Sequence, residues 1–182
     1  VTGATAASGT SISQTLSTTG SSPGTAVYTI TPSANGCSGN PITVTVIVNP
    51  IPVATATPST QTICSGSVTD IELTSTVQGT SFSWTVNQTG VSGAFNSSGS
   101  SISQTLTARF NVPGTATYTV TPIANGCPGN PITVTITVNP IPVATAEPSS
   151  QAICSGSATD IELESTVANS SFSWTVVQNG VD

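Results

Sequence analysis

Apolar and polar side chains alternate along most of this chain, a pattern typical of β-strands with one buried face. The alternation is clearest in residues 118–124 and 132–138, and a cluster of Gly, Asn and Pro separates these two runs. Such an arrangement predicts a β-hairpin. Since no long stretch has helical spacing, we expect an all-β fold.

The sequence repeats itself after 90 positions. A shift by 90 aligns the chain with itself without a gap, and 64 of the 92 overlapping residues are identical. This period is too long for a solenoid repeat of about 20–50 residues, but it suits a complete small domain. We therefore expect tandem domains, each with its own core.

Two proline-rich breaks interrupt the alternation, and we expect them to be domain junctions. Both read Asn-Pro-Ile-Pro, so their prolines (Pro50, Pro52, Pro140 and Pro142) predict short, stiff connectors. The chain begins partway through a repeat and is expected to be a piece of a longer exported polypeptide. The predicted domains are a complete repeat at residues 51–140, the second half of a preceding repeat at residues 1–50, and the first half of a following repeat at residues 141–182.

Within residues 51–140, seven short strands at roughly ten-residue spacing predict an antiparallel β-sandwich of the immunoglobulin-like kind. The first strand is expected to break at Pro58 and to resume near residues 61–64. Trp84 lies on the third predicted strand, where such folds place a core tryptophan, and Tyr118 resembles a tyrosine corner. The predicted core residues include these two and their equivalents in the other copies, Trp174 and Tyr28.

Charge is almost absent from this chain. Charged residues make up 4% of it, the net charge is −6, and the only basic residue is Arg109. Binding to nucleic acid or to anionic membranes therefore has no electrostatic basis. No apolar run approaches the roughly 20 residues of a membrane span, so we expect no membrane insertion.

The usual catalytic groups are also missing. Without His or Lys the chain lacks the common general bases and amine nucleophiles, and no Ser lies in a G-x-S-x-G motif. Asp70 and Glu72 could offer oxygen ligands to Ca²⁺, but two carboxylates are too few, and a solvated strand face is the favoured interpretation. We therefore expect no enzyme activity, no cofactor and no metal site.

Several motifs occur in order and recur in more than one copy: I-C-S-G-x-x-T-D-I-x-L, then F-S-W-T-V, then Y-T-x-T-P-x-A-N-G-C-x-G-N-P-I-T-V-T. Together they resemble the PKD-like, immunoglobulin-like tandem repeats of very large secreted proteins of Bacteroidota. Many of those proteins are surface adhesins, some are associated with gliding motility, and they are exported by the type IX route. The resemblance covers the whole chain and implies an extracellular location at the cell surface. It brings no catalytic residues with it.

The four cysteines occur two per period, and an even number in an exported protein favours disulfides. In an immunoglobulin-like sandwich, Cys64 and Cys127 would lie at opposite ends of the domain, roughly 30 Å apart by strand rise. A disulfide needs Cα atoms within about 7 Å. We therefore favour disulfides between neighbouring domains over pairing within one domain, free thiols or metal binding, for all four residues: Cys37, Cys64, Cys127 and Cys154.

Two functions fit this sequence. The first is a structural stalk or filament of a large surface adhesin, built from rigidly joined repeats that contact their neighbours in the chain and associate side by side. The alternative is a binding module for a glycan or another surface, using the loops that differ between copies. Phe95 and Phe110 occur in one copy only and are the candidate contacts for such a ligand.

Overall fold

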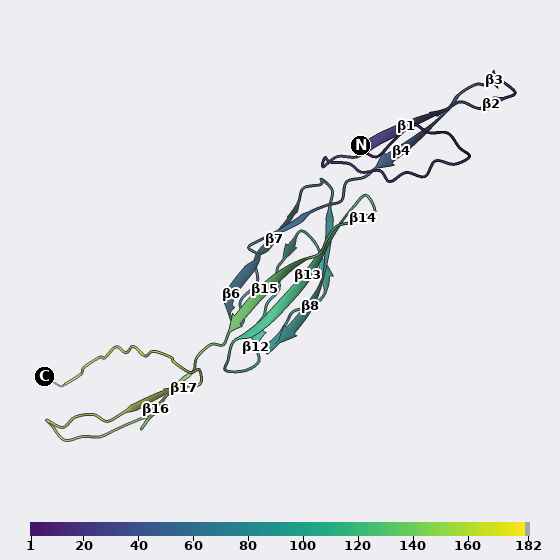
Figure 1. Cartoon of the computed structure of the whole chain (residues 1–182). Coiled ribbons are helices and arrows are strands. Elements are labelled where there is room, and N and C mark those ends of the chain that lie inside the picture. The colour runs from purple at the N-terminus through teal and green to yellow at the C-terminus, as the bar shows by residue number, and fades with distance from the viewer. Residues whose placement is uncertain (181–182) are drawn as a thin grey trace.

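The computed structural model describes residues 1–180 and is all-β, as the sequence predicts (Figure 1). None of the described residues belongs to a helix that could cross a membrane. The strands are β1 (Gly24–Ile30), β2 (Ser33–Ala34), β3 (Cys37–Ser38), β4 (Ile42–Val48), β5 (Ala54–Thr57), β6 (Thr60–Cys64), β7 (Ile71–Ser75), β8 (Ser81–Thr89), β9 (Val91–Ser92), β10 (Ser97–Ser98), β11 (Ser101–Ile102), β12 (Thr107–Ala108), β13 (Gly114–Ala124), β14 (Cys127–Pro128), β15 (Ile132–Asn139), β16 (Ala144–Glu147) and β17 (Glu162–Ser165).

Strands β5 to β15 form one closed sandwich, which we call the central sandwich. One sheet has the order β10-β8-β13-β15-β6, with β14 paired to β13, and the facing sheet has the order β11-β7-β5. The short strands β9 and β12 pair with each other beside these sheets. This arrangement confirms the expected immunoglobulin-like β-sandwich.

The first strand of the central sandwich changes sheets at the predicted break. Strand β5 pairs antiparallel with β7, whereas β6, beyond Pro58, runs parallel to β15. The parallel register places Thr60 opposite Thr135 and Cys64 opposite Asn139. The first strand therefore ties both layers together, and its last residue lies beside the end of the last strand.

The core fills the space between the two sheets. Trp84 on β8 and Tyr118 on β13 are buried, as predicted, and they pack with aliphatic residues of β7, β11 and β15. Every residue of this core cluster lies between Ala54 and Val138. Burial of this kind is the main favourable term in folding, and residues 51–140 supply all the apolar side chains of this core.

The two ends of the chain keep part of the strand pairing of the central sandwich, and the N-terminal segment also keeps the hairpin pair β2–β3, equivalent to the pairing of β14 with the end of β13. β1 pairs with β4 in the N-terminal segment (residues 1–50), as β13 pairs with β15, and β16 pairs with β17 in the C-terminal segment (residues 141–180), as β5 pairs with β7. The expected burial of Trp174 is wrong for this chain, because Trp174 is 80% exposed whereas Trp84 is 5% exposed. Trp84 lies on β8 between its sheet neighbours β10 and β13, and no equivalent strands flank Trp174 in residues 141–180. Tyr28 is half-buried, because its strand β1 pairs with β4 alone, whereas the equivalent strand β13 pairs with both β15 and β8.

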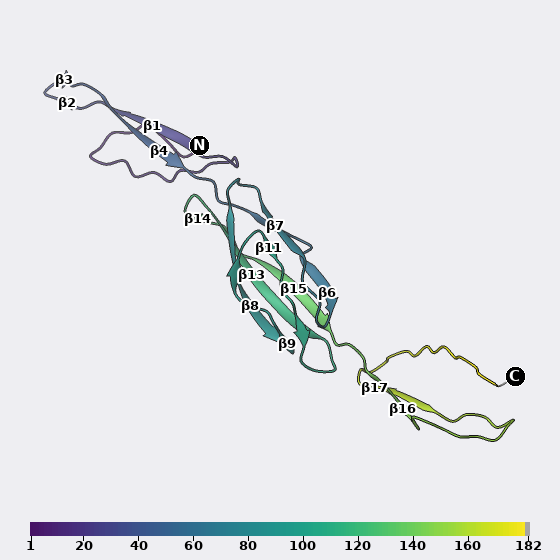
Figure 2. The ribbon, with the colours of Figure 1, turned by 180° about the vertical axis from the view of Figure 1, so that it is seen from behind.

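The three parts lie end to end and give the molecule an elongated shape (Figures 1 and 2). The hairpin that carries β14 points back toward the N-terminal segment, and β6 and β15 end near the C-terminal segment. The places where these parts meet are therefore formed by hairpin tips, strand ends and the two proline-rich connectors.

Candidate functional site at the junction between domains

The hairpin tip of the central sandwich has the geometry that its sequence predicts. Ala124 pairs with Cys127, and the two residues between them, Asn125 and Gly126, have φ angles of 49° and 78°. Positive φ at both central residues defines a type I′ turn, for which Asn-Gly is the preferred pair. The turn fixes the direction of the tip, and Cys127 follows it directly.

This tip contacts the connector that precedes the domain. The side-chain Nδ2 of Asn49 donates a hydrogen bond to the backbone oxygen of Asn125, over 3.2 Å. Gly129 lies so close to the connector that a Cβ atom there would overlap the carbonyl oxygen of Pro52. Only glycine allows such an approach between two backbones. The hairpin therefore braces the connector from the side.

The prolines of the two connectors differ in burial, and the difference agrees with this contact. Pro50 and Pro52 are buried, whereas Pro140 is half-buried and Pro142 is exposed. No hairpin equivalent to the one around Gly129 follows Pro142 in the described residues. The burial of Pro52 therefore depends on the second half of its own domain, which returns to cover the connector at which the domain begins.

A cleft of about 560 Å³ lies at the same junction. One wall comes from the loop 16–21 of the N-terminal segment, and the other comes from Thr76 and Val77 of the central sandwich, with Asn49, Ile51 and Val53 between them. The loop 17–22 differs strongly from its equivalent at 107–112. A segment that varies between copies therefore borders this junction.

The cysteines of the central sandwich occupy its two opposite ends. Cys64 pairs with Asn139 at the end of β15, and Cys127 lies before Ile132, where β15 begins. Between Ile132 and Asn139 the strand rises about 23 Å, at roughly 3.3 Å per residue. Since a disulfide needs Cα atoms within about 7 Å, these two cysteines cannot pair within one domain.

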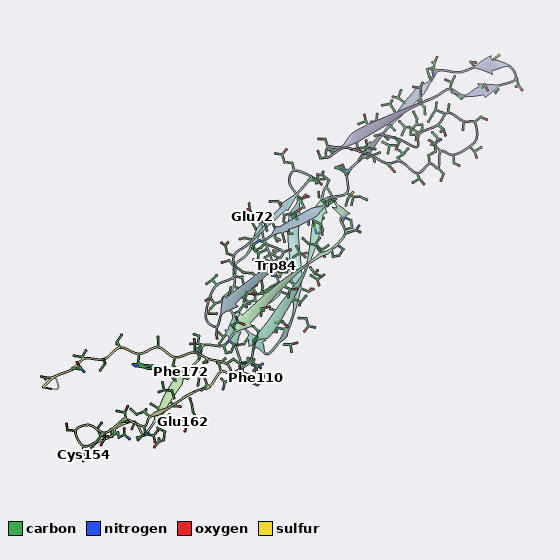
Figure 3. All side chains as sticks on the ribbon, turned by 60° about the vertical axis from the view of Figure 1, so that its left-hand side comes forward. Glu72, Trp84, Phe110, Cys154, Glu162 and Phe172 are labelled. Carbon is green, nitrogen blue, oxygen red and sulfur yellow. The ribbon has the colours of Figure 1, made fainter. Side chains whose placement is uncertain are left out.

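The other two cysteines lie at the outer ends of the molecule. Cys37 begins β3, in the hairpin at the far end of the N-terminal segment (Figure 1), and Cys154 lies at the far end of the C-terminal segment (Figure 3). All four thiols are free in this structure. We call Cys37 and Cys127 the hairpin cysteines, and Cys64 and Cys154 the first-loop cysteines. In the central sandwich, the hairpin cysteine lies at the end that faces the N-terminal segment, and the first-loop cysteine lies at the end that faces the C-terminal segment.

A buried polar residue that sequence reasoning missed sits inside the sandwich. Gln104 accepts a hydrogen bond at Oε1 from the hydroxyl of Tyr118 (2.9 Å) and donates one from Nε2 to the backbone oxygen of Phe95 (2.9 Å). The Tyr118 hydroxyl thus bonds to a side chain, whereas a tyrosine corner would bond to nearby backbone. Burial raises the pKa of Tyr118 to about 12. One signal was available, because Ser-Ile-Ser-Gln-Thr-Leu is identical in both copies.

The acidic pair lies on a solvated face, as predicted. Asp70 and Glu72 are both exposed, as are Asp160 and Glu162 in the C-terminal segment. Within residues 1–180, no three His, Cys, Asp or Glu side chains come together as a metal site would require. The acidic residues therefore contribute surface charge.

The two copy-specific aromatics are exposed. Phe95 is 58% exposed and Phe110 is 64% exposed. The backbone of Phe95 is held on both sides, since its N–H donates to Oε1 of Gln104 and its carbonyl accepts from Nε1 of Trp84. Phe110 lies at the lower end of the central sandwich, next to the C-terminal segment (Figure 3).

Comparison with known proteins agrees with this architecture. The family model of the PKD-like domain matches residues 1–52 and 61–142, in two separate stretches that together cover well over half of the chain. A search of curated proteins finds no match. The two stretches end at residues 52 and 142, ninety positions apart, which is consistent with the 90-residue repeat. The chain therefore belongs to the family of PKD-like domains.

Proposed function

We propose that this chain is part of a structural stalk, a rod of immunoglobulin-like repeats that holds some other part of a large surface protein away from the cell. In this proposal, residues 51–140 are one complete repeat, and the two terminal segments are halves of further repeats. The observation that carries the proposal is the braced connector. A linker that is covered by the domain following it, through Asn49–Asn125 and Pro52–Gly129, resists bending far better than a free one.

The proposed location is the bacterial cell surface, in an adhesin of the kind found in Bacteroidota and exported by the type IX route. Support comes from the PKD-like family, which is common in extracellular proteins, and from the sequence motifs. We propose that the rod has no catalytic activity and takes no cofactor. With only 4% charged residues, neighbouring rods repel one another little, which favours side-by-side association into filaments.

A second candidate function is adhesion through exposed aromatics. It is favoured by Phe95, whose exposed ring stands on a backbone that Gln104 and Trp84 hold in place. An aromatic ring on a rigid support is a suitable platform for a sugar ring. A glycan array probed with this chain should show binding that is lost in Phe95→Ala or Phe110→Ala if this function holds.

Solution scattering on tandem arrays tests the stalk directly. Residues 51–140 can be joined in series, because Pro140 followed by Ile51 reproduces the Asn-Pro-Ile-Pro sequence of both natural junctions. For a rod, each added repeat should lengthen the particle by about 40 Å, the rise of an 11-residue strand plus the junction.

A matched array with a Gly/Ser insert between Pro140 and Ile51 provides the control. Its overall length should grow more slowly, roughly as the square root of the number of repeats. Equal growth with and without the insert would rule out a stiff junction. Electron microscopy of the intact parent polypeptide should show a rod of beads with the same spacing.

A further inference from the structure

We propose that each junction is closed by a disulfide between the first-loop cysteine of one repeat and the hairpin cysteine of the next. In the numbering of this chain, Cys127 would bond to the cysteine that stands one repeat before Cys64. Cys64 would likewise bond to the cysteine one repeat after Cys127. The pairing is inferred from the junction geometry, and its mechanical consequence rests on the proposed stalk function.

The first step of the argument is the position of Cys64 at the end of its own domain. Cys64 is the direct partner of Asn139 in the parallel pair β6–β15, and the next amide, Ser65 N–H, donates to the Asn139 carbonyl over 2.8 Å. The thiol is therefore held beside the last residue before the connector. It is also exposed, so a partner can reach it.

The second step uses the repeat. Asn49 is the equivalent of Asn139, and its side chain touches Asn125 in the turn of the following domain. Cys127 follows that turn and is only partly exposed. One asparagine therefore has a first-loop cysteine on one side and a hairpin cysteine of the next repeat on the other. This contact is the independent observation that brings the two thiols to one place.

Forming the bond is an oxidation, and its electrons need an acceptor. The thiolate of one cysteine attacks the disulfide of an envelope dithiol–disulfide oxidoreductase and forms a mixed disulfide. The thiolate of the second cysteine then displaces the enzyme. Two protons and two electrons leave the pair of thiols, and the oxidoreductase disulfide becomes a dithiol.

In an array, the disulfides and the chain segments between them would form two interleaved covalent paths, which we call threads. Within one thread, the chain runs from Cys127 to Cys154, 27 positions later, and then crosses by a disulfide to a hairpin cysteine one repeat further on. The same spacing of 27 separates Cys37 from Cys64. Each thread thus uses 27 residues of chain for every two repeats of rod.

This spacing makes the oxidised rod almost inextensible. Twenty-seven extended residues span about 95 Å at roughly 3.5 Å each, close to the folded length of about 80 Å for two repeats. Unfolding a repeat in the oxidised rod therefore releases hardly any length. A reduced repeat of 90 residues would release about 28 nm, its extended length less its folded length.

A two-repeat array with one cysteine in each repeat tests the pairing. The array keeps Cys64 in the first copy of residues 51–140 and Cys127 in the second, and it carries serine at the other two positions. In a glutathione redox buffer it should remain monomeric and lose both free thiols. Two matched controls keep Cys127 first and Cys64 second, or both cysteines in one copy, and each should retain two free thiols per chain.

The proposal is overturned if the test array keeps both thiols, or if either control closes as readily. A rod-like array whose thiols stay free would overturn the disulfide and leave the stalk function standing.

The mechanical consequence is tested by stretching single molecules of a four-repeat array. Unfolding steps of about 28 nm should appear only after reduction, and an array with serine at every cysteine should show them in both conditions.

Discussion

The hydroxyl of Tyr118 donates a 2.9 Å hydrogen bond to Oε1 of Gln104, inside a core that is almost entirely apolar. The same carboxamide also binds both backbone groups of Phe95, and the backbone N–H of Gln104 donates to the hydroxyl of buried Thr69. No buried side-chain N or O atom lacks a partner in the described part of the chain. One glutamine therefore satisfies a tyrosine from one sheet and the backbone of an irregular segment that lies over the core.

Replacing Gln104 with leucine should destabilise the central sandwich by about 2–4 kcal/mol. The substitution leaves the Tyr118 hydroxyl and the Phe95 N–H without their partner, whereas the Phe95 carbonyl keeps its bond from Trp84 Nε1, and each group left unpaired costs about 1–3 kcal/mol. The free energy of unfolding can be measured with urea. The double variant with Tyr118→Phe should cost less than the sum of the two single variants, because removing both partners leaves fewer unsatisfied groups.

Gln14→Leu is the matched control. Gln14 makes the same contacts in the N-terminal segment, with the Tyr28 hydroxyl and with Thr5, but it lies near solvent. Water can replace the lost partners there, so the expected cost is below about 0.5 kcal/mol. Equal effects of Gln14→Leu and Gln104→Leu would contradict the role of burial in this network.

Alkaline pH should weaken the central sandwich through Tyr118. Burial raises the pKa of Tyr118 to about 12, above its ordinary value of 10.0. A raised folded-state pKa gives stability that is complete below pH 10 and is lost as pH rises from 10 to about 12. The free energy of unfolding should fall by about 1.4 kcal/mol per pH unit in that window. Tyr118→Phe should remove this fall in the free energy of unfolding between pH 10 and about 12. If the fall remained in the variant, it would come from another titrating group.

Much of the fold follows from local pattern. The alternation in residues 132–138 predicts the buried face of β15, the Gly, Asn and Pro cluster around Asn125-Gly126 predicts the hairpin turn, and Pro58 predicts the break in the first strand. These features depend on side-chain period and backbone preference, which neighbouring residues determine. They are therefore readable from one sequence.

The features that were missed depend on tertiary contacts. Gln104 looks like an ordinary polar residue, and only the folded structure shows that Tyr118 and Phe95 close around it. Trp174 occupies a core position by equivalence but is exposed, since burial requires strands from elsewhere in a repeat. The contact between Gly129 and Pro52 joins residues that are distant in the chain, so no local sequence pattern predicts it.

Gly129→Ala should loosen the junction. A Cβ atom at this position would overlap the Pro52 carbonyl and press on Pro122, so the hairpin must move away from the connector. Overpacking of this kind costs about 1–3 kcal/mol. Hydrogen exchange at Ile51 and Val53 should become faster, and the unfolding temperature of the central sandwich should fall.

Gly39→Ala is the control, because it adds the same methyl group to an equivalent hairpin that has no contact with the connector. Gly39 is the equivalent residue in the N-terminal segment and approaches Pro32, but no connector lies against it. Its replacement should leave exchange at Ile51 and Val53 unchanged. If both variants changed the connector equally, the bracing of Pro52 by the hairpin would be refuted.

Completing the C-terminal segment should bury Trp174. The residues around Trp174 match those around Trp84, and the difference in exposure (80% against 5%) arises from the strands that cover them. Adding a second copy of residues 93–140 after position 182 supplies those strands. In a Trp84→Phe background, the fluorescence emission of Trp174 should then shift to shorter wavelength and lose its quenching by iodide.

The control is the same addition in a Trp174→Phe background, which should leave the fluorescence emission of Trp84 unchanged. If Trp174 remained open to iodide, the equivalence of residues 141–182 to the first half of a repeat would fail in structure, although it holds in sequence.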